Sequence, residues 1–170
     1  MDVRRESEAT PMKNRTEVER RSERELVVTR TVDAPARHVF EAWTKPELLK
    51  RWWAPKSFGI SFISCEADVR TGDTYRFVFS HAASEQAVAF FGRYIEVTPH
   101  SRIVWTNEES ADGAISTVTF EEKGDKKLLV LHELYPSKQA LDDAIASGST
   151  SGAGEQFEQL DTPLATLVRS

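Results

Sequence analysis

Residues 33–55 read DAPARHVFEAWTKPELLKRWWAP and end close to two adjacent tryptophans, Trp52 and Trp53. Consecutive residues of a helix point about 100° apart, so the two indoles cannot share one stripe of a helix. Leu48 and Leu49 stand four residues before them and form two neighbouring stripes with them. We therefore expect Trp52 to lie in the core and Trp53 at the rim of a binding space.

The same stretch predicts two short helices in succession. Helical spacing relates the apolar residues of the first, which are Ala36, Val39, Phe40 and Trp43. Asp33 is a suitable N-cap for that helix, and Thr44 with Glu47 forms the pattern of a capping box for the second. Pro55 ends the helical stretch.

Strand patterns lie on both sides of this helical stretch. The β-branched run at 25–32 predicts a first strand. Six more strands are expected in short runs separated by Gly, Pro and Asp turns, at 60–69, 74–80, 87–97, 102–108, 114–122 and 127–135. Such a series is typical of an antiparallel meander.

Two helices are expected after the strands. Ser137 caps the first of them, and Gly148 ends it. The last helix carries an apolar stripe at Phe157, Leu160, Leu164 and Leu167, and Pro163 predicts a kink or a break within it. The predicted fold is therefore α+β: a curved antiparallel sheet of about seven strands wrapped around a long C-terminal helix, with the two short helices closing the seam.

Composition limits the class of protein. The hydrophobic fraction of 39% and the charged fraction of 29% are typical of one globular domain, and the net charge of −5 argues against nucleic acid as a partner. The chain has one cysteine, Cys65, no apolar run long enough for membrane insertion and no secretory signal, so a cytoplasmic location is expected. Residues 1–24 are charged and predict a disordered or loosely docked tail that proteolysis would trim, ahead of a domain at 25–170.

Three stretches resemble one family. They are RTVDAPARHVFEAWTKPELLKRWWAP at 30–55, CEADVRTGDTYRFVF at 65–79 and FGRYIEVTPHSRIVWT at 91–106. Together they are similar to homologues of the activator of the heat-shock-protein-90 ATPase, in the START-related helix-grip (SRPBCC) superfamily. The resemblance implies a helix-grip fold with an internal, mostly apolar cavity, and a link to the stress response. It does not imply one activity.

The expected ligand is a small hydrophobic molecule held between the sheet and the last helix. The expected cavity residues are mostly aromatic: Trp52, Trp53, Tyr75, Phe77, Phe79, Trp105, His132, Phe157, Leu160 and Leu164. No cofactor and no metal site are predicted, because no pair of histidines has metal-ligand spacing. A homodimer surface is expected on the outer face of the sheet, near Val78 and 87–91.

Two other functions remain open. An enzyme of the cyclase or hydrolase kind would need an inward polar pair, such as His132 with Glu66 or Arg76, and binding without catalysis is the preferred interpretation. A co-chaperone-like interaction module is the other. Glu66 with Asp68 and the lone Cys65 are interpreted as structural residues rather than catalytic ones.

Overall fold

The computed structural model describes residues 16–81, 84–123, 126–148 and 152–169. Strands and helices follow one another as β1 Thr16–Arg20, β2 Glu25–Val32, α2 Ala36–Thr44, α3 Pro46–Trp52, the 3₁₀ turn η2 Lys56–Phe58, β3 Ile60–Ala67, β4 Thr74–His81, β5 Ser84–Thr98, β6 Arg102–Thr106, β7 Ile115–Lys123, β8 Lys126–Leu134, α4 Lys138–Ala146 and α5 Ala153–Arg169. The predicted order of strand, two short helices, six strands and two helices is confirmed for the chain from residue 25 onward.

The sheet is antiparallel and has eight strands in the order β1-β2-β8-β7-β6-β5-β4-β3. The additional strand is β1, which pairs with β2 from Thr16↔Arg30 to Arg20↔Leu26. Residues 16–20 are therefore an edge strand of the sheet and not part of a tail, so the expectation for 1–24 needs correction there. Residues 1–15 lie outside the described part of the chain.

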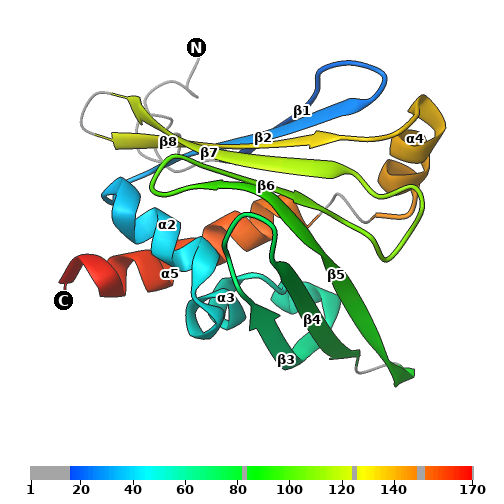
Figure 1. The fold of residues 1–170 in the computed structure, drawn as a ribbon, viewed down its shortest axis with the longest axis horizontal. Helices are drawn as coiled ribbons and strands as arrows, with labels where there is room; N and C mark the ends of the chain where they lie inside the picture. The colour runs from blue at the N-terminus through cyan, green and yellow to red at the C-terminus, as the bar shows by residue number, and fades with distance from the viewer. Residues whose placement is uncertain (1–15, 82–83, 124–125, 149–151, 170) are drawn as a thin grey trace, which may run out of the picture.

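The sheet curves around α5, and β5 makes most of the bend. In Figure 1 this strand runs from its neighbour β6 in the upper part of the sheet down to β4 and β3. Its register against β6 shifts between Tyr94 and Glu96, which leaves Ile95 as the extra residue of a bulge. Because a bulge bends its strand and increases the twist, β5 can belong to both parts of the sheet.

The starts of the two short helices differ from the sequence expectation. Pro35 and Lys45 occupy the N-cap positions of α2 and α3, and neither side chain makes a capping bond. The Thr44 hydroxyl is not available as a cap because it donates back to the carbonyl of Phe40 at 2.9 Å, within the last turn of α2. The cap expected at Ser137 is confirmed, since its hydroxyl accepts the N–H of Ala140 at 3.0 Å.

The core lies between the concave face of the sheet and α5. Phe157, Leu160 and Leu164 of α5 are each less than 5% exposed. Arg30 of β2 is also buried, and its guanidinium donates to Asp161 of α5 at 2.6 Å and to Thr16 of β1 at 2.8 Å. One buried cation thus joins the edge strand, the sheet and the helix that the sheet encloses.

Candidate functional site: an aromatic cavity with an acidic side

A cavity of about 570 Å³, called the main cavity below, opens between the concave side of β3, β4 and β5, the β6–β7 connection, α4 and the start of α5. Figure 1 shows α4 at the end of the sheet where β8 finishes, opposite the strands β3 to β5. Seven aromatic side chains line it: Trp53, Phe58, Tyr75, Phe77, Phe79, Phe90 and Tyr135. A mostly apolar cavity of this size is typical of small-molecule sites.

Trp52 and Trp53 divide between core and cavity. Trp52 is 1% exposed, and its indole N–H donates to the carbonyl of Ala42 at 2.9 Å. Trp53 is half-buried, packs against the Phe77 ring at a centroid distance of 5.4 Å and lines the main cavity. The burial predicted for Trp52 is therefore confirmed, and Trp53 stands where a ligand would meet it.

The first turns of α5 hold the segment that carries Trp53. The Gln156 amide donates to the carbonyl of Trp53, and the Gln159 amide donates to the carbonyls of Trp52 and Ala54 at 3.0 and 2.9 Å. These carbonyls follow the last turn of α3 and have no partner within that helix. The two glutamines satisfy them and thereby fix the aromatic wall to α5.

A chain of polar side chains lies at the other side of the main cavity. The Tyr75 hydroxyl donates to the carbonyl of Thr106 at 2.7 Å and lies 3.4 Å from Asn107 Oδ1. Asn107 Nδ2 donates to Ser116 Oγ at 2.9 Å, and the Ser116 hydroxyl donates to the Glu133 carboxylate. These four residues, called the polar chain below, connect β4, the β6–β7 connection, β7 and β8.

Burial changes the pKa of Glu133, a member of this chain, and of Tyr135, which also lines the main cavity. Desolvation raises the pKa of Glu133 to about 7, and the hydrogen bond from Ser116 opposes that shift. Desolvation, followed by the charge of Glu133, raises the pKa of Tyr135 to about 12. Glu133 therefore changes its charge near neutral pH, within an otherwise aromatic space.

A second space of about 20 Å³ extends the main cavity inward and shares Trp53, Tyr75 and Phe77 with it. Trp43, Tyr94 and Trp105 complete its aromatic wall. It has room for roughly one water molecule. The Trp43 ring is 4% exposed, and its N–H has no hydrogen-bond partner in the described structure.

Nine of the ten predicted cavity residues fall into three groups. Trp53, Tyr75, Phe77 and Phe79 line the main cavity, and Trp105 lines the small space. Trp52, Phe157, Leu160 and Leu164 belong to the packed core and line neither space. The structure thus places the apolar stripe of α5 in the core, while α5 meets the main cavity through Gln156.

The prediction that His132 lines the cavity needs the clearest correction. Its Nε2 lies 2.8 Å from the Glu25 carboxylate, and it does not line the cavity. The buried residues Leu129 and Leu131 face the core, and strand alternation then turns Glu133 inward and His132 outward. Neither Glu66 nor Arg76 can complete an inward pair, because both side chains are exposed. The two residues stand opposite each other in the register of β3 with β4.

Other candidate groups lie outside both spaces. Asp68 makes an exposed ion pair with Arg70, which holds the pKa of the Asp68 carboxyl below its usual range. Burial raises the pKa of the Cys65 thiol to about 11, so this thiol is not an activated nucleophile. Within the described ranges, no cluster of three His, Cys, Asp or Glu side chains could hold a metal ion. None of the helices described is both long and apolar enough to span a bilayer.

Sequence reasoning missed the polar side of the cavity. Asn107, Glu109, Ser110 and Asp112 lie in or beside the β6–β7 connection, and Asp143 and Ala144 lie on one face of α4. A polar loop gives no periodic signal, so only the folded topology reveals that it faces inward. Glu133 was the one residue with a sequence signal, since a carboxylate interrupts the apolar run at 128–134.

The architecture and the internal cavity define a helix-grip protein. The chain belongs to the family of activator of Hsp90 ATPase homolog 1-like proteins, whose model matches residues 33–165. Solved structures with the same fold include a Rhodobacter sphaeroides protein (TM-score 0.80, 22% identity, 89% of this chain and 99% of that chain covered). A Chromobacterium violaceum protein gives a TM-score of 0.71 at 27% identity, covering 83% and 97%. An AHSA1-like protein of Aeromonas hydrophila gives a TM-score of 0.66 at 15% identity, covering 80% and 90%. No curated protein matches the chain significantly.

Proposed function

We propose that this protein binds a small, largely apolar molecule in the main cavity. The observation that carries the proposal is the composition of the lining, in which seven aromatic side chains face a polar side that includes Asn107 and Glu133. An apolar body would contact the rings, while the polar chain would orient one polar group of the ligand. Family membership supports the proposal only as far as the fold.

Two neighbouring phenylalanines provide the test. Phe90 lines the main cavity, whereas Phe91 is 36% exposed and lies near Arg76 on the other face of the strand. With 2-naphthylmethanol as probe, calorimetric titration should show binding to the wild type and at least about tenfold weaker binding to Phe90→Ala, because part of the apolar wall is removed. Phe91→Ala should bind as the wild type does. Equal effects of the two substitutions would place the probe elsewhere and contradict the proposal.

A second candidate is an enzyme that uses the same cavity, and one observation favours it. The raised pKa of Glu133, about 7, suits a group that exchanges protons at neutral pH. The candidate acid or base is then Glu133, and not His132. Mass spectrometry of co-purified compounds, incubated with wild type and Glu133→Gln, separates the two functions: conversion that Glu133→Gln abolishes supports an enzyme, and unchanged compounds support binding alone.

The remaining expectations stay predictions. A co-chaperone role depends on the resemblance alone, and the cavity does not support it. Homodimer formation through the outer face of the sheet would use exposed apolar side chains there, among them Phe91 and Ile95. The cytoplasmic location is likewise a prediction.

A further inference from the structure

The charged side chains that line the main cavity all have one sign. Four carboxylates face it, and no Lys, Arg or His is among its described lining residues. The carboxylates come from three places in the fold: Glu109 and Asp112 from the β6–β7 connection, Glu133 from β8, and Asp143 from α4. They therefore surround the polar side of the cavity instead of following one element.

These carboxylates lack cationic partners in the described structure, although their neighbours in sequence have them. Glu108 pairs with Arg93 at 2.7 Å, and Asp142 pairs with Arg20 at 2.7 Å and with Lys138 at 2.9 Å. In contrast, from the described residues the Glu109 carboxylate accepts only the N–H of Phe91 at 3.3 Å, and the Asp143 carboxylate accepts only the Gln139 amide at 2.8 Å.

Glu133 is the deepest of the four. It accepts a hydrogen bond from Ser116, a residue that is 1% exposed, and it forms no ion pair with any described residue. A carboxylate in an aromatic space is costly unless a cation or further donors approach it. The raised pKa of Glu133 is the free protein's response to that cost.

The aromatic lining of the main cavity also favours a positively charged ligand. Trp53, Phe77, Phe79 and Phe90 line the space. The faces of aromatic rings attract organic cations, by roughly 0.5–2 kcal/mol per contact. An anion would meet four carboxylates and no cation, and a neutral ligand would leave the carboxylates without a counter-charge.

We propose that the ligand of this cavity is a hydrophobic cation: an apolar, ring-containing body with an ammonium or guanidinium group that meets Glu133 and Glu109. This inference rests on the function proposed above and specifies the chemical class of its ligand. Other lining carboxylates, Asp112 and Asp143, add to the negative potential at the mouth.

Three probes of one shape test it by calorimetric titration at pH 8, where Glu133 is ionised. They are 2-naphthylmethylamine, 2-naphthylmethanol and 2-naphthoate. The ammonium probe should bind at least about tenfold more tightly than the alcohol, and the carboxylate probe should bind most weakly. Glu133→Gln and Glu109→Gln should each reduce the preference for the ammonium several-fold. Glu108→Gln is the matched control, since its carboxylate is already paired with Arg93 and does not line the cavity.

Each outcome decides one of the two proposals. If the alcohol binds as tightly as the ammonium, the charge inference is overturned while binding of an apolar molecule stands. If the ammonium is preferred but neither Glu133→Gln nor Glu109→Gln changes that preference, the charge inference is also overturned. If none of the probes binds, the proposed function fails and the inference fails with it.

Discussion

Glu133 is a carboxylate whose environment differs strongly from water. Its folded pKa of about 7 lies above the ordinary glutamate pKa of 4.5, so folding favours the protonated form. The stability that this group contributes is therefore fully present below about pH 4.5 and is lost as the pH rises through 7. This pH dependence of stability has the opposite sign to that of an ordinary surface carboxylate with a cationic partner.

Glu133→Gln should remove this dependence, because the amide is neutral at every pH. At pH 8 the variant should be more stable than the wild type by up to about 3 kcal/mol, and near pH 5 the two should differ much less. Urea denaturation at both pH values measures the two free energies of unfolding. A difference that does not change with pH would show that the Glu133 carboxylate is ionised throughout.

For single residues, the sequence could predict the different placements of Trp52 and Trp53 but not the inward orientation of Glu133. The tryptophans follow helical geometry, in which neighbouring residues cannot share a stripe. In the run 128–134, residues of both faces are apolar, so alternation does not show which of His132 and Glu133 points inward. The register with β2 and β7, which is a tertiary property, decides it.

At the scale of elements, a kink or a break was expected in α5 at Pro163, and the break is excluded. The helix is assigned without interruption from Ala153 to Arg169, so it is not broken there. Pro163 is also among the fully buried residues. Proline has no N–H to donate to the carbonyl of Gln159, but its ring fills space in the core. Packing against the sheet therefore overrides the local preference to end the helix.

Pro163→Ala should raise the free energy of unfolding by up to about 1 kcal/mol. Inside a helix, alanine is favoured over proline by about 3 kcal/mol. The substitution also removes two buried methylenes and makes the unfolded chain more flexible, and these two effects offset most of that gain. Urea unfolding measures the change. Thr162→Ala, at an exposed position one residue earlier, is the control and should change stability little. A clear loss of stability in Pro163→Ala would show that the ring's packing outweighs the missing bond.

The strand β1 was not predictable from its sequence. Its residues TEVER are short and largely charged, and all but Thr16 are exposed, so they give neither alternation nor an apolar run. It pairs with β2 along its whole length, and Arg30, opposite Thr16, donates to the Thr16 hydroxyl at 2.8 Å. The strands that do contribute apolar side chains to the core were all found, because burial imposes a pattern on their sequences.

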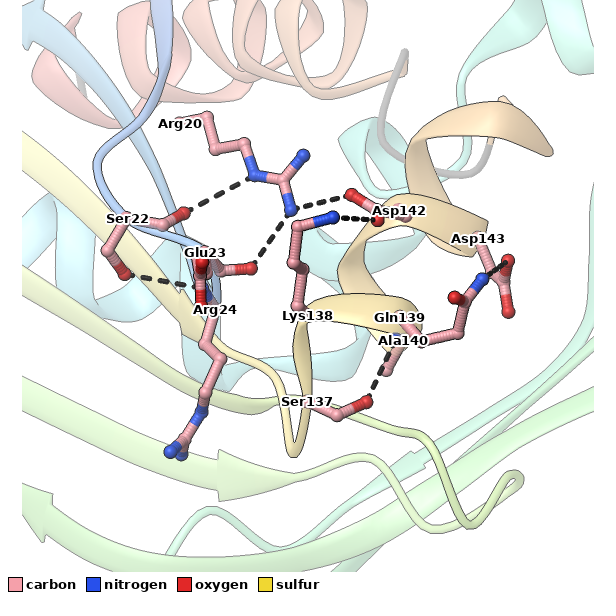
Figure 2. A network of polar contacts seen from close by, with 10 residues as sticks. All are labelled: Arg20, Ser22, Glu23, Arg24, Ser137, Lys138, Gln139, Ala140, Asp142 and Asp143. Atoms are coloured by element: carbon pink, nitrogen blue, oxygen red, sulfur yellow. Dashed lines mark hydrogen bonds and ion pairs between the residues drawn. The ribbon is translucent and has the colours of Figure 1, made fainter.

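For the whole molecule, the N-terminal hairpin connects the sheet to the helix that covers one end of the cavity. Figure 2 shows Arg20 reaching from the end of β1 to Asp142 on α4, where Lys138 approaches the same carboxylate. Arg20 also donates to the carbonyl of Glu23 at 2.9 Å, which fixes its guanidinium against the turn. The position of α4, and so of Asp143, depends in part on residues that the sequence suggested were a tail.

Removal of residues 1–20 should therefore destabilise the protein by about 2–4 kcal/mol, because Arg30 loses the Thr16 hydroxyl to which it donates and Asp142 loses its ion pair with Arg20. Thermal unfolding of the truncated and full chains measures the effect. Glu19→Ala in the full chain is a control on β1 that leaves both contacts in place and should have almost no effect. Equal midpoints for the truncated and full chains would restore the interpretation of this segment as dispensable.

The tryptophans of this chain, four in all, lie in one cluster. Trp43 stands 4.7 Å from Trp52, 5.7 Å from Trp53 and 5.7 Å from Trp105 between ring centroids. At such separations the indoles exchange excitation energy before they emit light, so the intrinsic fluorescence of the whole protein reports on one place. Because Trp53 lines the main cavity, any occupant that touches its ring should alter the emission of all four. The four indoles thus form a built-in optical probe of the main cavity, with which the proposed ligand binding can be tested on compound libraries without a label.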